Sequence, residues 1–252
     1  MTTTFMGVDL AWQSDKNHSG IAILRGDSRG ATLSSYSTDI ASLCNVVKYV
    51  LTNSTINTVV AIDAPLTIKN TVGQRPCENL IAKKFGRYHA SAHSSNLTLY
   101  PNAGSIQIAK LLEQNGFSHS ANPTTDKHKG GRWFFEVYPH PAQVVLFHLE
   151  KIIKYKKGRT ADKCAGLDLL RHYITTKCVQ GKPPLEPNRL FEKLLHQDFD
   201  TLKGKELKHY EDILDALVCA YLALYYWTWG AEKTEMIGNL VTGYIINPTE
   251  AL

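Results

Sequence analysis

Four aspartates occupy positions where carboxylates could share one site. Asp9 ends a short apolar run near the N-terminus, and Asp63 ends a continuous apolar run. Asp212 and Asp215 lie three residues apart in a long apolar stretch, which puts them on one face of a helix. A carboxylate at the end of a buried strand is costly to ionise unless a cation pairs with it or a metal binds it.

An all-oxygen set of ligands suits Mg²⁺ or Mn²⁺ better than Zn²⁺. Two such ions about 3.5–4 Å apart activate a water molecule and stabilise the leaving oxygen in phosphodiester cleavage. Taken singly, a strand-end aspartate more often caps a helix, and a helix-face aspartate often pairs with Lys or Arg. The conjunction of these positions favours a site, so Asp9, Asp63, Asp212 and Asp215 are predicted to be metal ligands and catalytic residues.

Two further charged residues have open alternatives. Glu136 lies in an apolar strand expected at residues 132–138, beside the strand that precedes it in the sheet. It either joins the site as a metal ligand or forms a structural ion pair with Arg75 or Arg132. Arg75 lies three residues before Glu78 on an expected helix, and it either pairs with Glu78 or clamps a substrate phosphate.

A basic segment at residues 151–159 places five Lys and Arg residues around Tyr155. Such a segment can follow a phosphate backbone, which makes Tyr155, Lys156 and Lys157 candidates for substrate binding. The alternative is a solvated charged surface. The basic excess of the whole chain, 28 Lys and Arg against 23 Asp and Glu, permits nucleic acid as a partner without requiring it.

Two other patterns match only parts of catalytic motifs. His89 and His93 have the spacing of metal ligands on a helix, but Ala90 stands where a metalloprotease has Glu, so a polar surface loop is predicted. Residues 26–30 match the G-x-S-x-G nucleophile elbow. The residues after them alternate like a strand, so the glycines predict a hairpin turn.

The elements that must position these residues describe a single α/β domain over residues 1–252, with insertions at about 66–131 and 151–205. Apolar patterns predict strands at 5–9, 20–24, 32–38, 58–63 and 132–138, and helices at 40–51, 76–85, 105–114 and 206–229. Asp39 is expected to cap the first of these helices. The aromatic residues of the last helix are expected in the core, and the tail after it in a hairpin.

Length and composition exclude several classes of protein. With 252 residues, 43% hydrophobic and 20% charged, the chain is neither disordered nor fibrous. Its longest apolar run has twelve residues, fewer than the roughly 18 of a membrane-spanning helix, and no signal-peptide pattern is visible. Five scattered cysteines without a C-x-x-C motif favour the cytoplasm over a disulfide framework.

Several short motifs follow one another in a set order. They are Gly7-Val8-Asp9-Leu10-Ala11-Trp12, Ala61-Ile62-Asp63-Ala64-Pro65-Leu66, Arg75-Pro76-Cys77-Glu78, Glu136-Val137-Tyr138-Pro139, Tyr155-Lys156-Lys157 and Asp212-Ile213-Leu214-Asp215-Ala216-Leu217. Over about residues 5–230 the chain thereby resembles the domain-of-unknown-function family 429, which is grouped with ribonuclease H-like predicted nucleases. The last motif also resembles the final helix of RuvC-type Holliday-junction resolvases.

The resemblance implies a ribonuclease H-like three-layer α/β domain whose mixed five-stranded sheet has the order 3-2-1-4-5 and carries helical insertions. In that superfamily, acids of the first strand, the fourth strand and the late helix bind divalent metal, and Asp9, Asp63, Asp212 and Asp215 match them. Ribonuclease H proper adds a glutamate on the first helix. Residues 40–51 contain none, so the RuvC-like pattern fits better than hybrid cleavage.

The favoured function is therefore hydrolysis of nucleic acid by a Mg²⁺- or Mn²⁺-dependent nuclease. One alternative is a ribonuclease H-like binding or scaffold protein without turnover, in which basic residues neutralise the acids. Another is a hydrolase or transferase of a small phosphorylated molecule, which a deep and closed pocket would favour. No membrane partner is expected, and a homodimer is the default oligomeric state.

Overall fold

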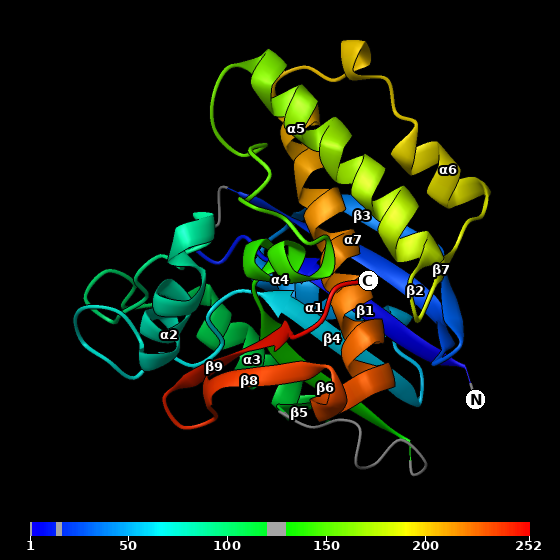
Figure 1. Ribbon diagram of the computed structural model, residues 1–252. Helices are drawn as coiled ribbons and strands as arrows, with labels where there is room; N and C mark the ends of the chain where they lie inside the picture. The colour runs from blue at the N-terminus through cyan, green and yellow to red at the C-terminus, as the bar shows by residue number, and fades with distance from the viewer. Residues whose placement is uncertain (1, 14–16, 120–129) are drawn as a thin grey trace.

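The structure is a computed structural model that describes residues 2–13, 17–119 and 130–252 (Figure 1). Its strands are β1 (Thr3–Asp9), β2 (His18–Asp27), β3 (Gly30–Ala41), β4 (Asn57–Asp63), β5 (Ser118–His119), β6 (Gly131–Val137), β7 (Leu185–Glu186), β8 (Thr234–Asn239) and β9 (Gly243–Pro248). Its α-helices are α1 (Leu43–Asn53), α2 (Pro76–Phe85), α3 (Gly104–Gln114), α4 (Pro139–Leu146), α5 (Thr160–Tyr173), α6 (Arg189–Leu195) and α7 (Lys205–Trp229). Short 3-10 segments cover Gly86–Tyr88, Phe199–Thr201 and Gly230–Glu232, and a π-helical turn spans Ile174–Cys178.

One mixed sheet has the order β7-β3-β2-β1-β4-β6-β9-β8, and β5 pairs with β6. The predicted α/β class and the order of its first four strands are confirmed, and this order is consistent with a ribonuclease H-like core. The predicted count of five strands is wrong, since the described residues form nine. The additional strands are the two-residue strands β5 and β7 and the C-terminal hairpin β8–β9.

The central strands are apolar throughout because both faces of the sheet are covered. Alternate residues of each strand belong to two separate hydrophobic clusters. Phe5 and Val59 pack on the side of α7, whereas Met6 and Val60 pack on the side of α1 and α3. In Figure 1, α7 (orange) crosses β1, β2 and β4 at a steep angle. A continuous apolar run is the pattern expected of strands buried on both faces.

The parallel register of β1 and β4 places Asp9 directly beside Asp63. Neighbouring strands lie about 4.8 Å apart, and both of these strands end at these residues. The two carboxylates therefore start from the same edge of the sheet, as the family resemblance implied.

The long helix α7 is almost entirely buried from Tyr210 to Trp227, and this confirms that its aromatic side chains belong to the core. Its backbone lies directly against β1 at Gly7, where a Cβ atom would come within 2.0 Å of the Ala216 carbonyl oxygen. Glycine at this position allows the contact that sets the first half of α7 over the ends of β1 and β4. None of the described helices combines the length and apolar character that crossing a membrane requires.

The first helix begins later than the sequence pattern predicts. Strand β3 continues to Ala41, paired with β2, and Ser42 caps α1 by accepting a hydrogen bond from the Asn45 amide. Pairing of the end of β3 with the start of β2 thus keeps Ile40 and Ala41 in a strand, although the helical spacing of apolar residues starts at Ile40. Asp39 is consequently a strand residue that contacts His18, and it is no helix cap.

Two other local expectations, a turn at residues 26–30 and a C-terminal hairpin, hold. The glycines of residues 26–30 form the turn of the β2–β3 hairpin, with Gly26 opposite Ala31. The tail forms the β8–β9 hairpin. The first of the two segments interpreted as insertions holds α2, α3 and β5, and the second holds α5, α6 and β7.

Replacing Gly7 with Ala should destabilise the fold. The added methyl group would collide with the backbone of α7 at Ala216 and Ala220, so we expect a loss of about 3 kcal/mol or more, at the upper end of the range for overpacked sites. Urea unfolding monitored by circular dichroism measures the change. Gly86→Ala is the matched control, because Gly86 has helical backbone angles and its nearest non-local neighbour would be 3.5 Å away. A similar loss in both variants would contradict the close approach at Gly7.

Candidate metal centre

The four predicted aspartates meet where α7 crosses the ends of β1 and β4. Asp212 and Asp215 lie in the first half of α7, and Asp215 is completely buried. On the neighbouring strand β2, Gly20 is opposite Asp9, and a Cβ atom there would lie 2.7 Å from the Asp212 carbonyl oxygen. The helix can therefore approach the sheet closely at the site. The charges of the three other carboxylates are near enough to raise the pKa of Asp9.

The basic segment predicted for substrate binding sends two of its residues into this cluster. The Lys156 ammonium lies 2.7 Å from Asp215 Oδ2, and the Tyr155 hydroxyl donates to Asp215 Oδ1 at 2.6 Å. The Gln143 amide in turn donates to the Tyr155 oxygen at 3.0 Å. The Tyr155 side chain is fully buried. Its hydroxyl bonds to Asp215, a candidate metal ligand, and is not exposed to solvent where a substrate could bind it. Lys157 is exposed beside them.

Lys208 is a second cation of the site that the sequence analysis overlooked. Its ammonium lies 2.5 Å from Asp212 Oδ1 and 2.8 Å from Glu211 Oε1. The spacings of three and four residues along one helix are those at which oppositely charged side chains meet, so this contact had a local signal.

The cluster is more acidic than these two lysines can balance. It holds five acids, namely the four aspartates and Glu211, against Lys156 and Lys208. Burial raises the pKa of Asp63 to about 7, with Lys156 opposing the shift and Asp215 adding to it. Burial likewise raises the pKa of Asp9 well above its ordinary value. Within the described parts of the chain, no hydrogen bond reaches the carboxylate of Asp9 or of Asp63, so these two need a proton or an added cation.

Asp215 differs from its neighbours because it has partners. Burial acts to raise its pKa, but Lys156, His140 and the two hydrogen bonds hold the pKa of Asp215 below its ordinary value. Burial also acts against the charge of Lys156, and the carboxylates outweigh it, so that the pKa of Lys156 is raised well above its ordinary value. Asp215 and Lys156 therefore form a permanently charged pair at the centre of the site.

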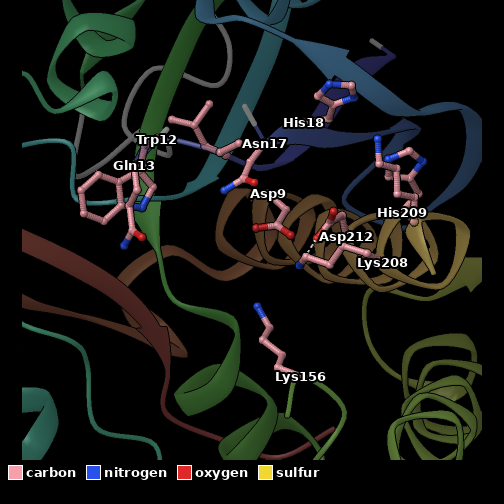
Figure 2. Close-up of a pocket in the computed structure, with 12 residues that line it drawn as sticks. Asp9, Trp12, Gln13, Asn17, His18, Lys156, Lys208, His209 and Asp212 are labelled. Carbon is pink, nitrogen blue, oxygen red and sulfur yellow. Dashed lines mark hydrogen bonds and ion pairs between the residues drawn. The ribbon is translucent and has the colours of Figure 1, made fainter. Parts of the chain in front are cut away.

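Two adjoining hollows open onto the cluster, and Asp9 and Lys156 line both. The smaller, of about 320 Å³, lies between the end of β1 and the start of α7. Figure 2 shows the Lys156 side chain reaching toward Asp9 in this hollow, with Lys208 beside Asp212. The larger, of about 550 Å³, is bounded by Asp63, Lys157 and the loop that carries the exposed His89 and His93. The prediction of an exposed polar loop at these histidines is confirmed.

Arg75 and Glu136 form a buried ion pair with each other. Arg75 donates to both carboxylate oxygens of Glu136, at 2.6 and 2.9 Å, and to Glu78 Oε1 at 2.7 Å. The Leu66 amide also donates to Glu136, which anchors the turn that follows Asp63. The structural pair is the alternative that the geometry shows, so we leave Glu136 out of the proposed metal ligands and Arg75 out of the proposed phosphate contacts.

Two residues that lie next to the Asp215–Tyr155 pair could not be identified from any motif or spacing in the sequence. Gln143 and His140 are both on α4, and their side chains approach the Asp215–Tyr155 pair. Burial lowers the pKa of His140 to about 4, and the nearby Lys156 adds to this effect. Only the packing of α4 against α7 brings them to the site.

Replacing Arg75 with Ala should destabilise the protein strongly. It would leave the buried carboxylates of Glu78 and Glu136 without their cation, and breaking a buried ion pair from one side costs about 3–5 kcal/mol. Chemical denaturation measures this. Lys84→Ala, which removes the half-exposed partner of Glu235, is the control and should cost no more than about 1 kcal/mol. Equal, small losses would instead favour the role of phosphate clamp for Arg75.

The contribution of Asp63 to stability should fall as pH rises between 3.8 and about 7, the ordinary and the folded-state pKa of this residue. In this interval the folded state keeps a proton at Asp63 that the unfolded chain releases, so rising pH favours unfolding. Asp63→Asn removes this contribution and leaves those of Asp9 and His140 in place, so the stability gained over wild type should grow with pH and reach about 1 kcal/mol or more at pH 7. Urea titrations across this interval measure it, with the exposed Asp200→Asn as control. A wild-type slope retained in Asp63→Asn would contradict the shift.

The comparisons with known proteins give a family and no activity. The family model described as Protein of unknown function (DUF429) matches residues 7–235, a span that contains all four aspartates and both lysines of the site. No curated protein and no solved structure matches the chain. Since the family match covers most of the sequence, the chain belongs to the DUF429 family.

Proposed function

We propose that this protein is a divalent-metal-dependent phosphodiesterase that acts on nucleic acid, with Asp9, Asp63, Asp212 and Asp215 as the ligands of Mg²⁺ or Mn²⁺. The observation that carries the proposal is the register of β1 and β4, which sets Asp9 beside Asp63 under the acidic face of α7. Three elements distant in the sequence thus supply one cluster of carboxylates.

The donor set fits hard divalent cations. All four side chains offer carboxylate oxygens, which Mg²⁺ and Mn²⁺ prefer. Asp9 and Asp63 have raised pKa values because burial disfavours their charge, and bound cations would stabilise the ionised forms. When bound, such ions supply a nucleophilic water at neutral pH and stabilise charge on the leaving oxygen.

The residues of the chain itself hold the site and meet the substrate. Tyr155 and Lys156 fix the orientation of Asp215 through its two oxygens. Lys156 lines both hollows, so its ammonium is placed to contact a phosphate that lies over Asp9. Lys157 lines the larger hollow and Lys205 the smaller one.

This distribution of lysines supports a polymeric substrate. Two adjoining hollows share one wall, and cationic side chains continue from one to the other. A nucleic-acid strand has phosphates at regular intervals that can contact several of these lysines at once. A single small phosphate ester would use only one of the two hollows.

The arrangement also argues against a scaffold without turnover. In a scaffold, basic residues would neutralise the acids, but Lys156 and Lys208 bond to the acids of α7. Asp9 and Asp63, at the ends of the strands, are left without a hydrogen-bonded cation among the described residues. Lys156 offsets only part of the cost of charging these two acids, since their pKa values stay raised, and an added cation would offset the rest.

The proposal is tested by calorimetric titration of Mn²⁺ into wild type, Asp63→Asn and the control Asp200→Asn at low salt. Each titration is repeated with a phosphorothioate oligonucleotide present, so that phosphate oxygens can complete the coordination. We expect wild type and Asp200→Asn to bind Mn²⁺ in at least one condition and Asp63→Asn to lose this binding. Wild type that binds no Mn²⁺ in either condition, or binding that Asp63→Asn leaves intact, would refute the metal site.

Cleavage of end-labelled single-stranded and branched DNA, and of RNA, tests turnover in Mg²⁺ or Mn²⁺. Asp9→Asn and Asp63→Asn should each lower the rate by about 100-fold or more, the scale of losing a main source of charge stabilisation. Lys156→Ala should weaken substrate binding and reduce its dependence on salt. Cleavage equal in wild type and both aspartate variants would mean that the activity does not arise at this site.

A further inference from the structure

Three side chains of types that can bind metal ions, His18, Asp39 and His209, converge beside the smaller hollow. His18 is the first residue of β2, Asp39 lies near the end of β3, and His209 is near the start of α7. One ligand atom of each, a ring nitrogen or a carboxylate oxygen, lies within 4.8 Å of those of the other two. His18 and His209 also line the hollow that contains Asp9.

The fold itself brings these residues together. In the antiparallel β2–β3 pair, His18 is opposite Ala41. The pairing shifts register just after this point, between Ser19 and Ile21, so Asp39 lies at an irregularity of β3. Its carboxylate contacts His18 Nδ1. Helix α7 packs across β2 and β3 and adds His209, whose ring stacks on that of His18 with centroids 5.9 Å apart. Figure 2 shows the two rings together on one side of the hollow.

We propose that His18, Asp39 and His209 form a site for a divalent transition-metal ion such as Zn²⁺. Two imidazoles and one carboxylate are a donor set typical of zinc and related ions, and it differs from the all-oxygen set of the aspartate cluster. With metal–nitrogen bonds of about 2.0–2.1 Å, tetrahedral ligands lie roughly 3.3 Å apart, so small side-chain rotations suffice to close the site.

A surface His–Asp ion pair would explain His18 and Asp39 but not His209. Within the described residues Asp39 is the polar partner of His18, and no described residue hydrogen bonds to the ring of His209. The second imidazole nonetheless comes from another element and presents a nitrogen within ligand range. Convergence of a third donor on an existing pair is what a metal site requires.

The neighbouring lysines do not prevent cation binding. The ammonium of Lys208 is bonded to Glu211 and Asp212, which balance its charge. Lys205 is exposed to solvent. Three protein ligands leave at least one coordination position, which water or an anionic group of a molecule in the hollow would fill.

Visible absorption of Co²⁺ titrated into the full chain tests this site, with excess Mg²⁺ present to fill any carboxylate site. We expect one equivalent of Co²⁺ to give absorption bands of a four- or five-coordinate ion, and Zn²⁺ to remove them. His209→Gln and His18→Ala should weaken binding by more than the roughly 10–100-fold that loss of an outer-shell partner costs. Asp39→Asn should also weaken it.

Two control variants establish whether Co²⁺ binds at these three side chains or elsewhere on the chain. His196→Ala removes a histidine that lies 3.1 Å from Glu192 of α6 and has no third ligand among the described residues, so this variant should bind Co²⁺ like wild type. Asp63→Asn should also bind Co²⁺ normally, whether or not the proposed nuclease activity exists. The proposal is wrong if wild type gives no such bands, or if His209→Gln and His18→Ala, with unchanged circular dichroism, bind Co²⁺ within about twofold of His196→Ala.

Discussion

The parallel pairing of β1 with β4 is the constraint on which the rest of the site depends. It sets two carboxylates, Asp9 and Asp63, side by side at a partly buried edge, where the loss of water and the repulsion of nearby carboxylates such as Asp215 disfavour ionisation. Helix α7 then adds Asp212 and Asp215 from above. No arrangement of this kind is stable by itself in the charged form, so the surrounding structure has to hold the acids in place and supply compensating cations.

The lysines balance only part of the negative charge of the site, and both of them bond to acids of the same helix. Lys156 and Lys208 both bond to acids of α7, while Glu136, which could have added a further ligand, is paired with Arg75. Asp212 and Asp215 of the helix are thus held by lysines, whereas Asp9 and Asp63 of the strands have no hydrogen-bonded cation among the described residues. A site organised in this way is rigid on one side and able to accept a cation on the other, which suits metal binding better than a purely structural role.

Close backbone contact is what makes the convergence possible. Gly7 and Gly20 let α7 lie against β1 and β2 without intervening side chains, so the residues of the helix reach the strand ends. The same packing brings His209 against the β2–β3 edge, where His18 and Asp39 meet. One helix therefore contributes to two chemically different groups of donors, one of oxygen atoms and one dominated by imidazole.

The sequence alone determined the central strands and the long final helix, and it singled out the four aspartates as candidates, because apolar runs, helical spacing and strand ends are local patterns. It also indicated that Asp9 and Asp63 are neighbours, through a family resemblance rather than through spacing. Only the tertiary structure decided which cation faces which acid: Arg75 and Glu136 are 61 residues apart, and no local pattern links them. It likewise moved Asp39 from a helix cap to a strand beside His18, because strand pairing outweighed helical periodicity there. Long-range pairing and packing carry no signature in a short window of sequence, and they decide the chemistry of this site.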